Sequence, residues 1–180
     1  MHVVFLYGPP GVGKFSVGSE LARLTGFKLF HNHLTVNLVS AVFERDSEVW
    51  LNLLRRIRRE VLVEAVHNDI SLIMTGVYSG TSEHADAWWT MLEPVRTGAG
   101  SVVFVQLMCE RDELFQRVQN ENRRALDKLL DPVRLAEMME RHDLTATAPF
   151  EPHLRLDVTH LAPSHAAQRI SHYYGLPLVS

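Results

Sequence analysis

Three glycines and a lysine near the start of the chain are spaced so that they could hold a phosphate group. The stretch that carries them reads Gly8-Pro9-Pro10-Gly11-Val12-Gly13-Lys14. Glycine tolerates backbone conformations that turn several N–H groups inward around an anion, and a following helix directs its positive end at the same point. Lys14 can then reach the β- and γ-phosphates of a nucleotide. We therefore predict a phosphate-binding loop, with a plain turn carrying a surface lysine as the alternative.

The two residues after the lysine decide whether the loop also holds a metal ion. In such loops a serine or threonine follows the lysine and its hydroxyl binds Mg²⁺, whereas this chain has Phe15. Ser16 comes one position later, about 100° around a helix from that direction. We expect Ser16 to serve as the Mg²⁺ ligand after a local adjustment of the loop, with water in its place as the alternative. Residues 8–16 are thus the predicted cofactor-binding segment.

The loop needs a strand before it and a helix after it, and the sequence supplies both. Short runs rich in apolar and β-branched residues alternate with amphipathic stretches of helix length. The predicted strands are His2–Tyr7, Lys28–His31, Ile70–Val77, Ser101–Cys109 and Leu154–Val158. The predicted helices lie near residues 14–25, 35–44, 48–67, 83–96, 111–121, 132–142 and 164–174. Strands separated by helices form parallel sheets through right-handed crossovers, so we predict one three-layer α/β domain over residues 1–180.

Length, charge and cysteine content exclude several other kinds of protein. A chain of 180 residues fits one domain, and its formal net charge of −3 argues against a general nucleic-acid-binding protein. The single cysteine, Cys109, excludes an internal disulfide and a tetrathiolate zinc site. No apolar run approaches the roughly 20 residues that span a bilayer, and Met1 leads into a predicted strand rather than a leader peptide. We expect a cytoplasmic monomer or homodimer without membrane or nucleic-acid partners.

A basic segment follows the predicted strand at residues 101–109. The helix predicted there ends near an arginine pair, Arg123 and Arg124, before Asp131-Pro132, which is a typical helix start. Guanidinium groups suit both aromatic stacking and phosphate contact, so the segment predicts a basic flap at about residues 122–131. The alternative is that these arginines are ordinary solvated residues.

Together these features resemble the small P-loop kinases of the shikimate kinase, gluconate kinase and nucleoside monophosphate kinase type. The resemblance covers nearly the whole chain in element order and is most specific at the phosphate loop and at residues 114–124, Leu-Phe-Gln-Arg-Val-Gln-Asn-Glu-Asn-Arg-Arg. It implies a five-stranded parallel sheet in the order 2-3-1-4-5, a lid after strand 4, and ATP and Mg²⁺ as cofactors. It also implies that Arg117 stacks on adenine, that Arg123 or Arg124 clamps the phosphates, and that backbone near Asp157 wraps the base.

Two histidines stand where shikimate kinases have paired aspartates, in the stretch Phe30-His31-Asn32-His33. In that family the first aspartate assists Mg²⁺ and the second grips the acceptor hydroxyl. In an extended chain His31 and His33 point to one side, which at this sheet edge faces the ligand crevice. We expect residues 31–33 to bind the acceptor, with helix-capping or packing histidines as the alternative. A metal site made of the two imidazoles alone is disfavoured, because no third ligand lies nearby in sequence.

The segment after the third predicted strand reads Thr75-Gly76-Val77-Tyr78-Ser79-Gly80, where shikimate kinases have a glycine run. We expect Thr75, Gly76 and Tyr78 to bind the acceptor, with Gly76 letting the backbone approach it, while Tyr78 disfavours shikimate itself. The predicted third helix adds four arginines, which form either a solvated face or part of an anionic acceptor site. They are Arg55, Arg56, Arg58 and Arg59.

The function that these features predict is an ATP-dependent phosphotransferase acting on the hydroxyl or phosphate of a small molecule. Positioning and charge neutralisation carry most of phosphoryl transfer, so the missing aspartates are tolerable if His33 accepts the proton or orients the acceptor. Lys14, His33 and Arg123 are the predicted catalytic residues, and ATP and the acceptor are the predicted partners. A nucleotide-binding module without turnover is the alternative. A motor or helicase is disfavoured, because the chain is short and its third strand lacks a terminal aspartate.

Overall fold

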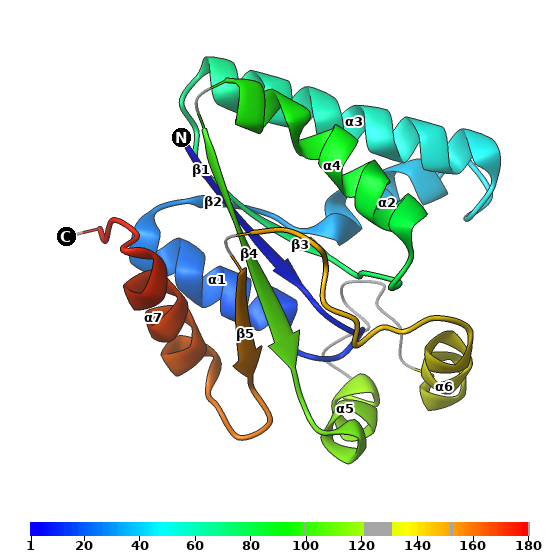
Figure 1. Cartoon of the computed structure of the whole chain (residues 1–180). Helices are drawn as coiled ribbons and strands as arrows, with labels where there is room; N and C mark the ends of the chain where they lie inside the picture. The colour runs from blue at the N-terminus through cyan, green and yellow to red at the C-terminus, as the bar shows by residue number, and fades with distance from the viewer. Residues whose placement is uncertain (99, 121–130, 152, 180) are drawn as a thin grey trace.

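Five parallel strands form one sheet at the centre of the computed structural model of the chain (Figure 1). They are β1 (His2–Tyr7), β2 (Lys28–Phe30), β3 (Leu72–Gly76), β4 (Ser101–Met108) and β5 (His153–Asp157). Their order across the sheet is β2-β3-β1-β4-β5, and each neighbouring pair is parallel. The predicted sheet and its strand order are confirmed. The structure describes residues 1–98, 100–120, 131–151 and 153–179.

Within these described residues seven helices flank the sheet. They are α1 (Lys14–Thr25), α2 (Asn32–Ser40), α3 (Glu48–His67), α4 (Ser82–Thr97), α5 (Arg111–Val118), α6 (Pro132–Arg141) and α7 (Pro163–Tyr174). Figure 1 shows α3 and α4 together on one face of the sheet and α1 and α7 on the other, which is the predicted three-layer arrangement. None of the helices in the described part of the chain combines the length and apolar character needed to cross a bilayer.

The alternating side chains of β1 explain why both faces of the sheet are covered. Val4 and Leu6 belong to the core against α1 and α7, whereas Val3, Phe5 and Tyr7 belong to the core against α3 and α4. All five are at most 2% exposed. Successive side chains of a strand point to opposite faces, so a strand covered on both sides reads as a continuous apolar run. This burial anchors β1 and thereby fixes the start of the loop that follows it.

Short polar residues set the first turns of two helices beside the site. Asp131 accepts a hydrogen bond from the backbone of the first turn of α6, and Pro132 is the first helical residue, which confirms the predicted start. Thr81 caps α4 in the same way, by accepting a hydrogen bond from His84 N. These caps satisfy backbone donors that the helix itself leaves without acceptors.

One helix boundary differs from the prediction in a way that matters for the site. α2 begins at Asn32 instead of residue 35, and His31 is its N-cap with φ −78° and ψ 150°. The extended geometry predicted for residues 31–33 is therefore correct at His31 and wrong at residues 32 and 33. The first turn of α2 carries little amphipathic signal, because Asn32, His33 and Thr35 are polar and Leu34 is exposed. It is held by a tertiary hydrogen bond from Asn32 N to Thr75 Oγ1 at 3.0 Å.

Candidate functional site

The carboxyl ends of the five strands meet at one edge of the sheet, because the strands are parallel (Figure 1). The phosphate loop follows β1 at this edge, residues 31–33 follow β2, and residues 77–81 follow β3. β4 leads to α5, and β5 leads to the turn at residues 158–159. Open α/β sheets bind their ligands at this edge. The topology thus brings the predicted phosphate-binding and acceptor-binding segments together.

The glycines of the phosphate loop are required by both conformation and space. The φ angles of Gly8, Gly11 and Gly13 are 144°, 94° and 107°, in the region open mainly to glycine. A Cβ atom on Gly8 would collide with the carbonyl oxygen of Leu107 in β4, and one on Gly11 would lie 2.7 Å from the side chain of Val118. A surface turn does not demand such close approach, so the geometry favours the phosphate loop over the plain turn.

Lys14 begins α1, and its ammonium group folds back over the loop. Its Nζ donates hydrogen bonds to the carbonyl oxygens of Gly8 at 2.7 Å and Pro9 at 2.8 Å. The positive end of a 12-residue helix lies at the same place. The loop, the ammonium group and the helix N-terminus therefore converge, as an anion site requires.

The middle of the loop is a tight turn anchored in the core. Pro10 and Gly11 form the turn, and Val12 N donates to the carbonyl oxygen of Pro9 at 3.4 Å. The side chain of Val12 is fully buried. Val17 N donates to the carbonyl oxygen of residue 13 at 3.0 Å, so α1 is regular from its first turn.

The first turn of α1 does not fit a protein-held Mg²⁺. The ring of Phe15 packs edge-on against His31, with centroids 5.1 Å apart and planes 87° apart. Because α1 is regular here, the side chain of Ser16 points about 100° around the helix from that of Phe15, the position where such loops carry the Mg²⁺ ligand. The side chain of Ser16 is exposed. Mg²⁺ prefers oxygen ligands, and the described residues contain no group of three His, Cys, Asp or Glu side chains that could hold a metal. Mg²⁺ binding by Ser16 stays a prediction without a supporting donor set.

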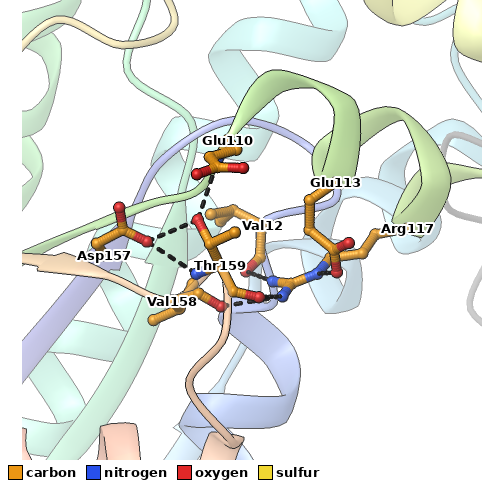
Figure 2. Close-up of polar contacts among 7 residues, drawn as sticks. All are labelled: Val12, Glu110, Glu113, Arg117, Asp157, Val158 and Thr159. Carbon is orange, nitrogen blue, oxygen red and sulfur yellow. Dashed lines mark hydrogen bonds and ion pairs between the residues drawn. The ribbon is translucent and has the colours of Figure 1, made fainter.

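Arg117, predicted as the adenine partner, lies near the end of α5 and reaches across to the loop (Figure 2). Its guanidinium donates to the carbonyl oxygens of Val12 at 3.2 Å, Val158 at 2.9 Å and Thr159 at 2.7 Å. Its Nε pairs with Glu113, one helical turn earlier, at 2.6 Å. These contacts use the edge of the guanidinium, whereas stacking would use its face. Contact with adenine stays a prediction.

Asp157 organises the turn after β5, where the resemblance places the base. Its Oδ1 accepts hydrogen bonds from Thr159 Oγ1 at 2.7 Å and Thr159 N at 2.8 Å. These two bonds hold the pKa of Asp157 below its usual range. Thr159 Oγ1 in turn accepts a hydrogen bond from Glu110 N at 2.9 Å (Figure 2). The ends of β4 and β5 are thus tied together beside the phosphate loop.

His31 and His33 lie close together even though α2 begins between them. Their ring centroids are 6.5 Å apart. Asn32, between them, exchanges hydrogen bonds with Thr75: Asn32 N donates to Thr75 Oγ1, which donates to Asn32 Oδ1 at 3.2 Å. Thr75 is buried. Two of the predicted acceptor residues therefore join β3 to α2, with the histidines beside that junction, and acceptor binding by all four stays a prediction.

Gly76 and Tyr78 are residues whose types are explained by core packing at the end of β3. A Cβ atom on Gly76 would lie 2.9 Å from ring atoms of Phe5 and Trp88. Tyr78 is 4% exposed, and its hydroxyl donates to the carbonyl oxygen of Thr81 at 3.2 Å. Both residues therefore pack the end of β3 against α4. A direct contact of either with an acceptor stays a prediction.

Arg58 is the arginine of α3 that turns toward the site. Its Nε donates to Thr35 Oγ1 at 2.8 Å, and its guanidinium also donates to the carbonyl oxygen of Asn32 at 3.3 Å. Burial lowers its pKa to about 10. In the described part of the chain no carboxylate forms an ion pair with it. A desolvated cation with neutral partners at a ligand edge is a candidate for binding an anion.

The other three arginines of α3 face a different environment. Arg55, Arg56 and Arg59 line a groove of about 430 Å³ between α3 and α4, together with Glu83 and Asp86. Glu83 and Asp86 are acidic residues of the same groove, and Arg59 forms an ion pair with Glu93 at 3.4 Å. This arrangement supports the solvated-face interpretation for these three and separates them from Arg58.

His84, in the first turn of α4, is a candidate site residue that no sequence pattern points to. Its Nδ1 accepts hydrogen bonds from Ser79 N at 3.2 Å and from Ser79 Oγ at 2.9 Å. A backbone N–H can only donate, so Nδ1 carries no proton, and the neutral ring has its proton on Nε2. Burial, followed by the charges of Arg55 and Arg58, lowers the pKa of His84. A lone histidine three residues after a helix N-cap has no distinctive spacing, and only the fold reveals its partners.

The predicted phosphate clamp cannot be placed. Arg123 and Arg124 lie outside the described residues, as does the predicted lid at about 122–131 apart from Asp131. The structure resumes at Asp131, where α6 is capped.

Comparison with known proteins gives matches of structure without matches of sequence. No family model and no curated protein matches the chain. A sugar kinase from a Janibacter species matches with a TM-score of 0.67 and 18% identity, covering 97% of this chain and 94% of that one. The tunicamycin resistance protein of Deinococcus radiodurans matches with a TM-score of 0.67 and 19% identity, covering 99% of this chain and 98% of that one. A shikimate kinase from Bacteroides thetaiotaomicron matches with a TM-score of 0.54 and 18% identity, covering 97% of this chain and 98% of that one.

The sheet order and these neighbours define the class of fold. The chain has the fold of the P-loop kinases, with the loop after β1 and the strand order β2-β3-β1-β4-β5. The predicted resemblance is thereby confirmed at the level of the fold. Identities below one fifth for these three neighbours show the fold alone, and the site residues must carry any statement about the reaction.

Proposed function

We propose that this protein is an ATP-dependent phosphotransferase whose acceptor is a small molecule with an anionic group. The observation that carries the proposal is the geometry of residues 8–14. Three glycines at positive φ, the ammonium group of Lys14 and the N-terminus of α1 converge there. That arrangement suits a nucleotide polyphosphate. The names of structural neighbours, a sugar kinase and a shikimate kinase among them, support the reaction class.

Lys14 is the group that would act on the transferred phosphate. It is held now by two peptide carbonyl oxygens. Charged phosphate oxygens are stronger acceptors than peptide carbonyls, so Lys14 would exchange these partners for the β- and γ-phosphates when ATP binds. There its charge would stabilise the charge that develops on the phosphoryl oxygens. Because the described residues do not fit a protein-held Mg²⁺, the loop and Lys14 carry the phosphate contacts in this proposal.

The basic groups around residues 77–81 support an anionic acceptor. Burial is the main cause of the lowered pKa of His84, and the charges of Arg58 in α3 and His142 after α6 lower it further, while Glu83 acts against them. Arg58 has two neutral oxygen partners and would gain a charged one from a carboxylate or phosphate. The Nε2–H group of His84 adds a neutral donor.

His33 is the proposed proton acceptor for the acceptor hydroxyl. It lies beside His31 in the first turn of α2, at the carboxyl edge of the sheet. A neutral imidazole can accept a proton or orient a hydroxyl group by accepting its hydrogen bond. Phosphoryl transfer asks little of a base, because positioning and electrostatic stabilisation provide most of the rate. An imidazole can therefore replace the aspartate of the resembling kinases.

A nucleotide-binding protein without turnover is the second candidate, and the Phe15–His31 contact favours it. A packed aromatic pair fills the place where the resembling kinases have a hydroxyl and a carboxylate. Such a site could still bind ATP through the loop while lacking the groups that assist transfer.

Phosphorus NMR separates the two candidates. The protein is incubated with ATP, magnesium chloride and a panel of small hydroxyl compounds that carry a carboxylate or phosphate, beside uncharged sugars of matched size. The proposed kinase forms ADP and a new phosphate ester with a charged acceptor and little product with the uncharged controls. ATP binding without ester formation for any compound supports the second candidate. Transfer to uncharged sugars alone contradicts the anionic acceptor.

A further inference from the structure

All three guanidinium nitrogens of Arg117 are engaged, and their partners belong to three separate segments. Nε pairs with Glu113 in α5, Nη1 donates to the carbonyl oxygen of Val12, and Nη2 donates to those of Val158 and Thr159. Figure 2 shows the guanidinium pointing from α5 toward the phosphate loop and the turn after β5. Donors of a charged guanidinium form stronger hydrogen bonds than neutral ones, and the planar fork holds its acceptors in fixed directions.

The contact with Val12 fixes the direction of one peptide group of the phosphate loop. The carbonyl of Val12 and the N–H of Gly13 belong to the same planar trans peptide, so they point in opposite directions. Because the carbonyl oxygen points to Arg117, the N–H of Gly13 points away from Arg117. If this peptide turned over, an oxygen would take the place of that N–H, and an oxygen repels a phosphate.

The orientation of the Val12–Gly13 peptide must be fixed by a contact from outside the loop, because the glycine itself does not restrict it. Gly13 has φ 107° and is the N-cap of α1, but no side chain caps the helix there. Glycine populates positive and negative φ about equally, so the peptide before it can turn over at low conformational cost. The fully buried side chain of Val12 anchors the residue, while the hydrogen bond from Arg117 selects the direction of its carbonyl.

The same guanidinium joins the loop to the turn at residues 157–159. That turn is itself fixed, since Thr159 bonds to the carboxylate of Asp157 and accepts a hydrogen bond from Glu110 N. Glu113 holds Nε in place from the other side. The position of the guanidinium is therefore determined by groups outside the loop, as expected for a group that positions the loop.

We propose that Arg117 is a positioning residue that holds the Val12–Gly13 peptide with its N–H toward the bound polyphosphate and ties the phosphate loop to the turn after β5. The proposal rests on the proposed function, since it presumes that the loop binds nucleotide phosphates. It differs from the adenine contact that the resemblance implies. A stacking residue acts on the base alone, whereas a residue that orients the loop acts on any ligand with the same phosphates.

Inorganic tripolyphosphate, which has no base, distinguishes the two roles. Dissociation constants for ATP and for tripolyphosphate are measured by calorimetry, well below the melting temperature, in the wild type, Arg117→Met and Arg117→Lys. We expect Arg117→Met to weaken both ligands by a similar factor, about tenfold to a hundredfold for the loss of charge-assisted hydrogen bonds. Arg117→Lys keeps the charge but lacks the fork, so we expect it to recover part of both affinities. Arg111→Met removes a charge from the exposed start of the same helix and is the matched control.

Selective isotope labelling allows the Val12–Gly13 peptide to be observed directly by NMR. The chain has two Val-Gly pairs, Val12-Gly13 and Val17-Gly18. Labelling valine with ¹³C at the carbonyl and glycine with ¹⁵N therefore gives two selected amide signals, and Gly18 inside α1 is the internal control. We expect tripolyphosphate to shift the Gly13 amide strongly in the wild type and weakly in Arg117→Met, with Gly18 unchanged in both. The Gly18 signal also shows whether each variant is folded.

The outcomes separate the inference from the function on which it rests. If Arg117→Met weakens ATP and leaves both the tripolyphosphate affinity and the Gly13 shift as in the wild type, Arg117 acts on the base and the inference is overturned. An equal loss in Arg111→Met also overturns it, because general charge would then explain the effect. If the wild type binds neither ATP nor tripolyphosphate, the proposed function fails, and the inference fails with it.

Discussion

Lys14 and Arg58 are both cations at the carboxyl edge of the sheet, and each donates hydrogen bonds to two neutral oxygens. Lys14 donates to two carbonyl oxygens of the loop, whereas Arg58 donates to Thr35 Oγ1 and a carbonyl oxygen of α2. Neutral oxygens compensate a desolvated charge only in part, and this deficit appears in the lowered pKa of Arg58. Arg58 would therefore gain from an anionic ligand. Lys14 lies on the predicted phosphate side of the site, and Arg58 lies on the predicted acceptor side.

Gly8 and Gly13 should respond differently to the same substitution. A Cβ atom on Gly8 would collide with the backbone of β4, and its φ is unfavourable for other residues. Among the described residues, a Cβ atom on Gly13 would approach only the Nη1 atom of Arg117, at 3.9 Å. We expect Gly8→Ala to lower the free energy of unfolding by about 3 kcal/mol or more and Gly13→Ala by about 1 kcal/mol. Urea denaturation measures both, and equal losses would show that the close approach of β4 is not decisive.

Arg58→Met should lower anion binding with little effect on stability. The substitution removes a costly desolvated charge and also two hydrogen bonds, so we expect the free energy of unfolding to stay within about 1 kcal/mol of the wild type. The variant Lys14→Ala weakens phosphate binding at the loop, so that binding near Arg58 can be measured alone. In this variant, inorganic phosphate bound near Arg58 should still raise the melting temperature. Arg58→Met should raise the dissociation constant for phosphate about tenfold, whereas Arg56→Met, at an exposed position of the same helix, should not. Equal phosphate binding in both double variants would contradict the acceptor subsite.

At the scale of elements, the start of α2 shows what sequence patterns miss. Apolar periodicity predicts the part of α2 that packs on α3 through Val36 and Val39, and this part is helical. The polar first turn is held by Thr75 in β3 and Arg58 in α3, contacts that lie 43 and 26 residues away in sequence. Caps whose partners are local, such as Asp131-Pro132, are predicted correctly. Helix ends that depend on tertiary hydrogen bonds are not.

The start of α4 should make folding stability depend on pH through His84. Its pKa in the folded chain is lowered, first by burial and then by Arg55, Arg58 and His142, with Glu83 opposing. Between that lowered pKa and about 6.5, the usual value for histidine, the unfolded chain therefore binds more protons than the folded one. Stability should fall as the pH decreases through this window.

The variant His84→Asn tests this dependence, because its side-chain oxygen can still accept the hydrogen bond from Ser79 N and does not titrate. Between pH 5 and 7 the free energy of unfolding of the wild type should rise more steeply than that of His84→Asn, by up to about 1.4 kcal/mol per pH unit. His165→Asn, at an exposed position on α7, is the control. Parallel profiles for the wild type and His84→Asn would contradict the lowered pKa.

At the scale of the whole molecule, the sequence predicts the topology and only part of the site. The apolar runs and the helices between them are local patterns, and they predict the strand order through the resemblance that they carry. The phosphate loop is also contiguous, so its glycines and Lys14 are recognisable from spacing. The contacts of Arg117 with Val12 and Thr159 span 105 and 42 residues and depend on how β1, β5 and α5 converge. No spacing pattern in the sequence predicts these contacts of Arg117. None predicts the surroundings of His84 either.

Calorimetric titration of ATP into the wild type and Lys14→Ala shows whether the loop at residues 8–14 binds the polyphosphate of ATP through Lys14. Lys14 donates hydrogen bonds to two neutral carbonyl oxygens of the loop, and we expect its replacement by alanine to change the melting temperature by at most about 4 °C. We expect the wild type to bind ATP and Lys14→Ala to bind it at least about tenfold more weakly. Unchanged affinity in a folded Lys14→Ala variant, or no ATP binding by the wild type, would contradict it.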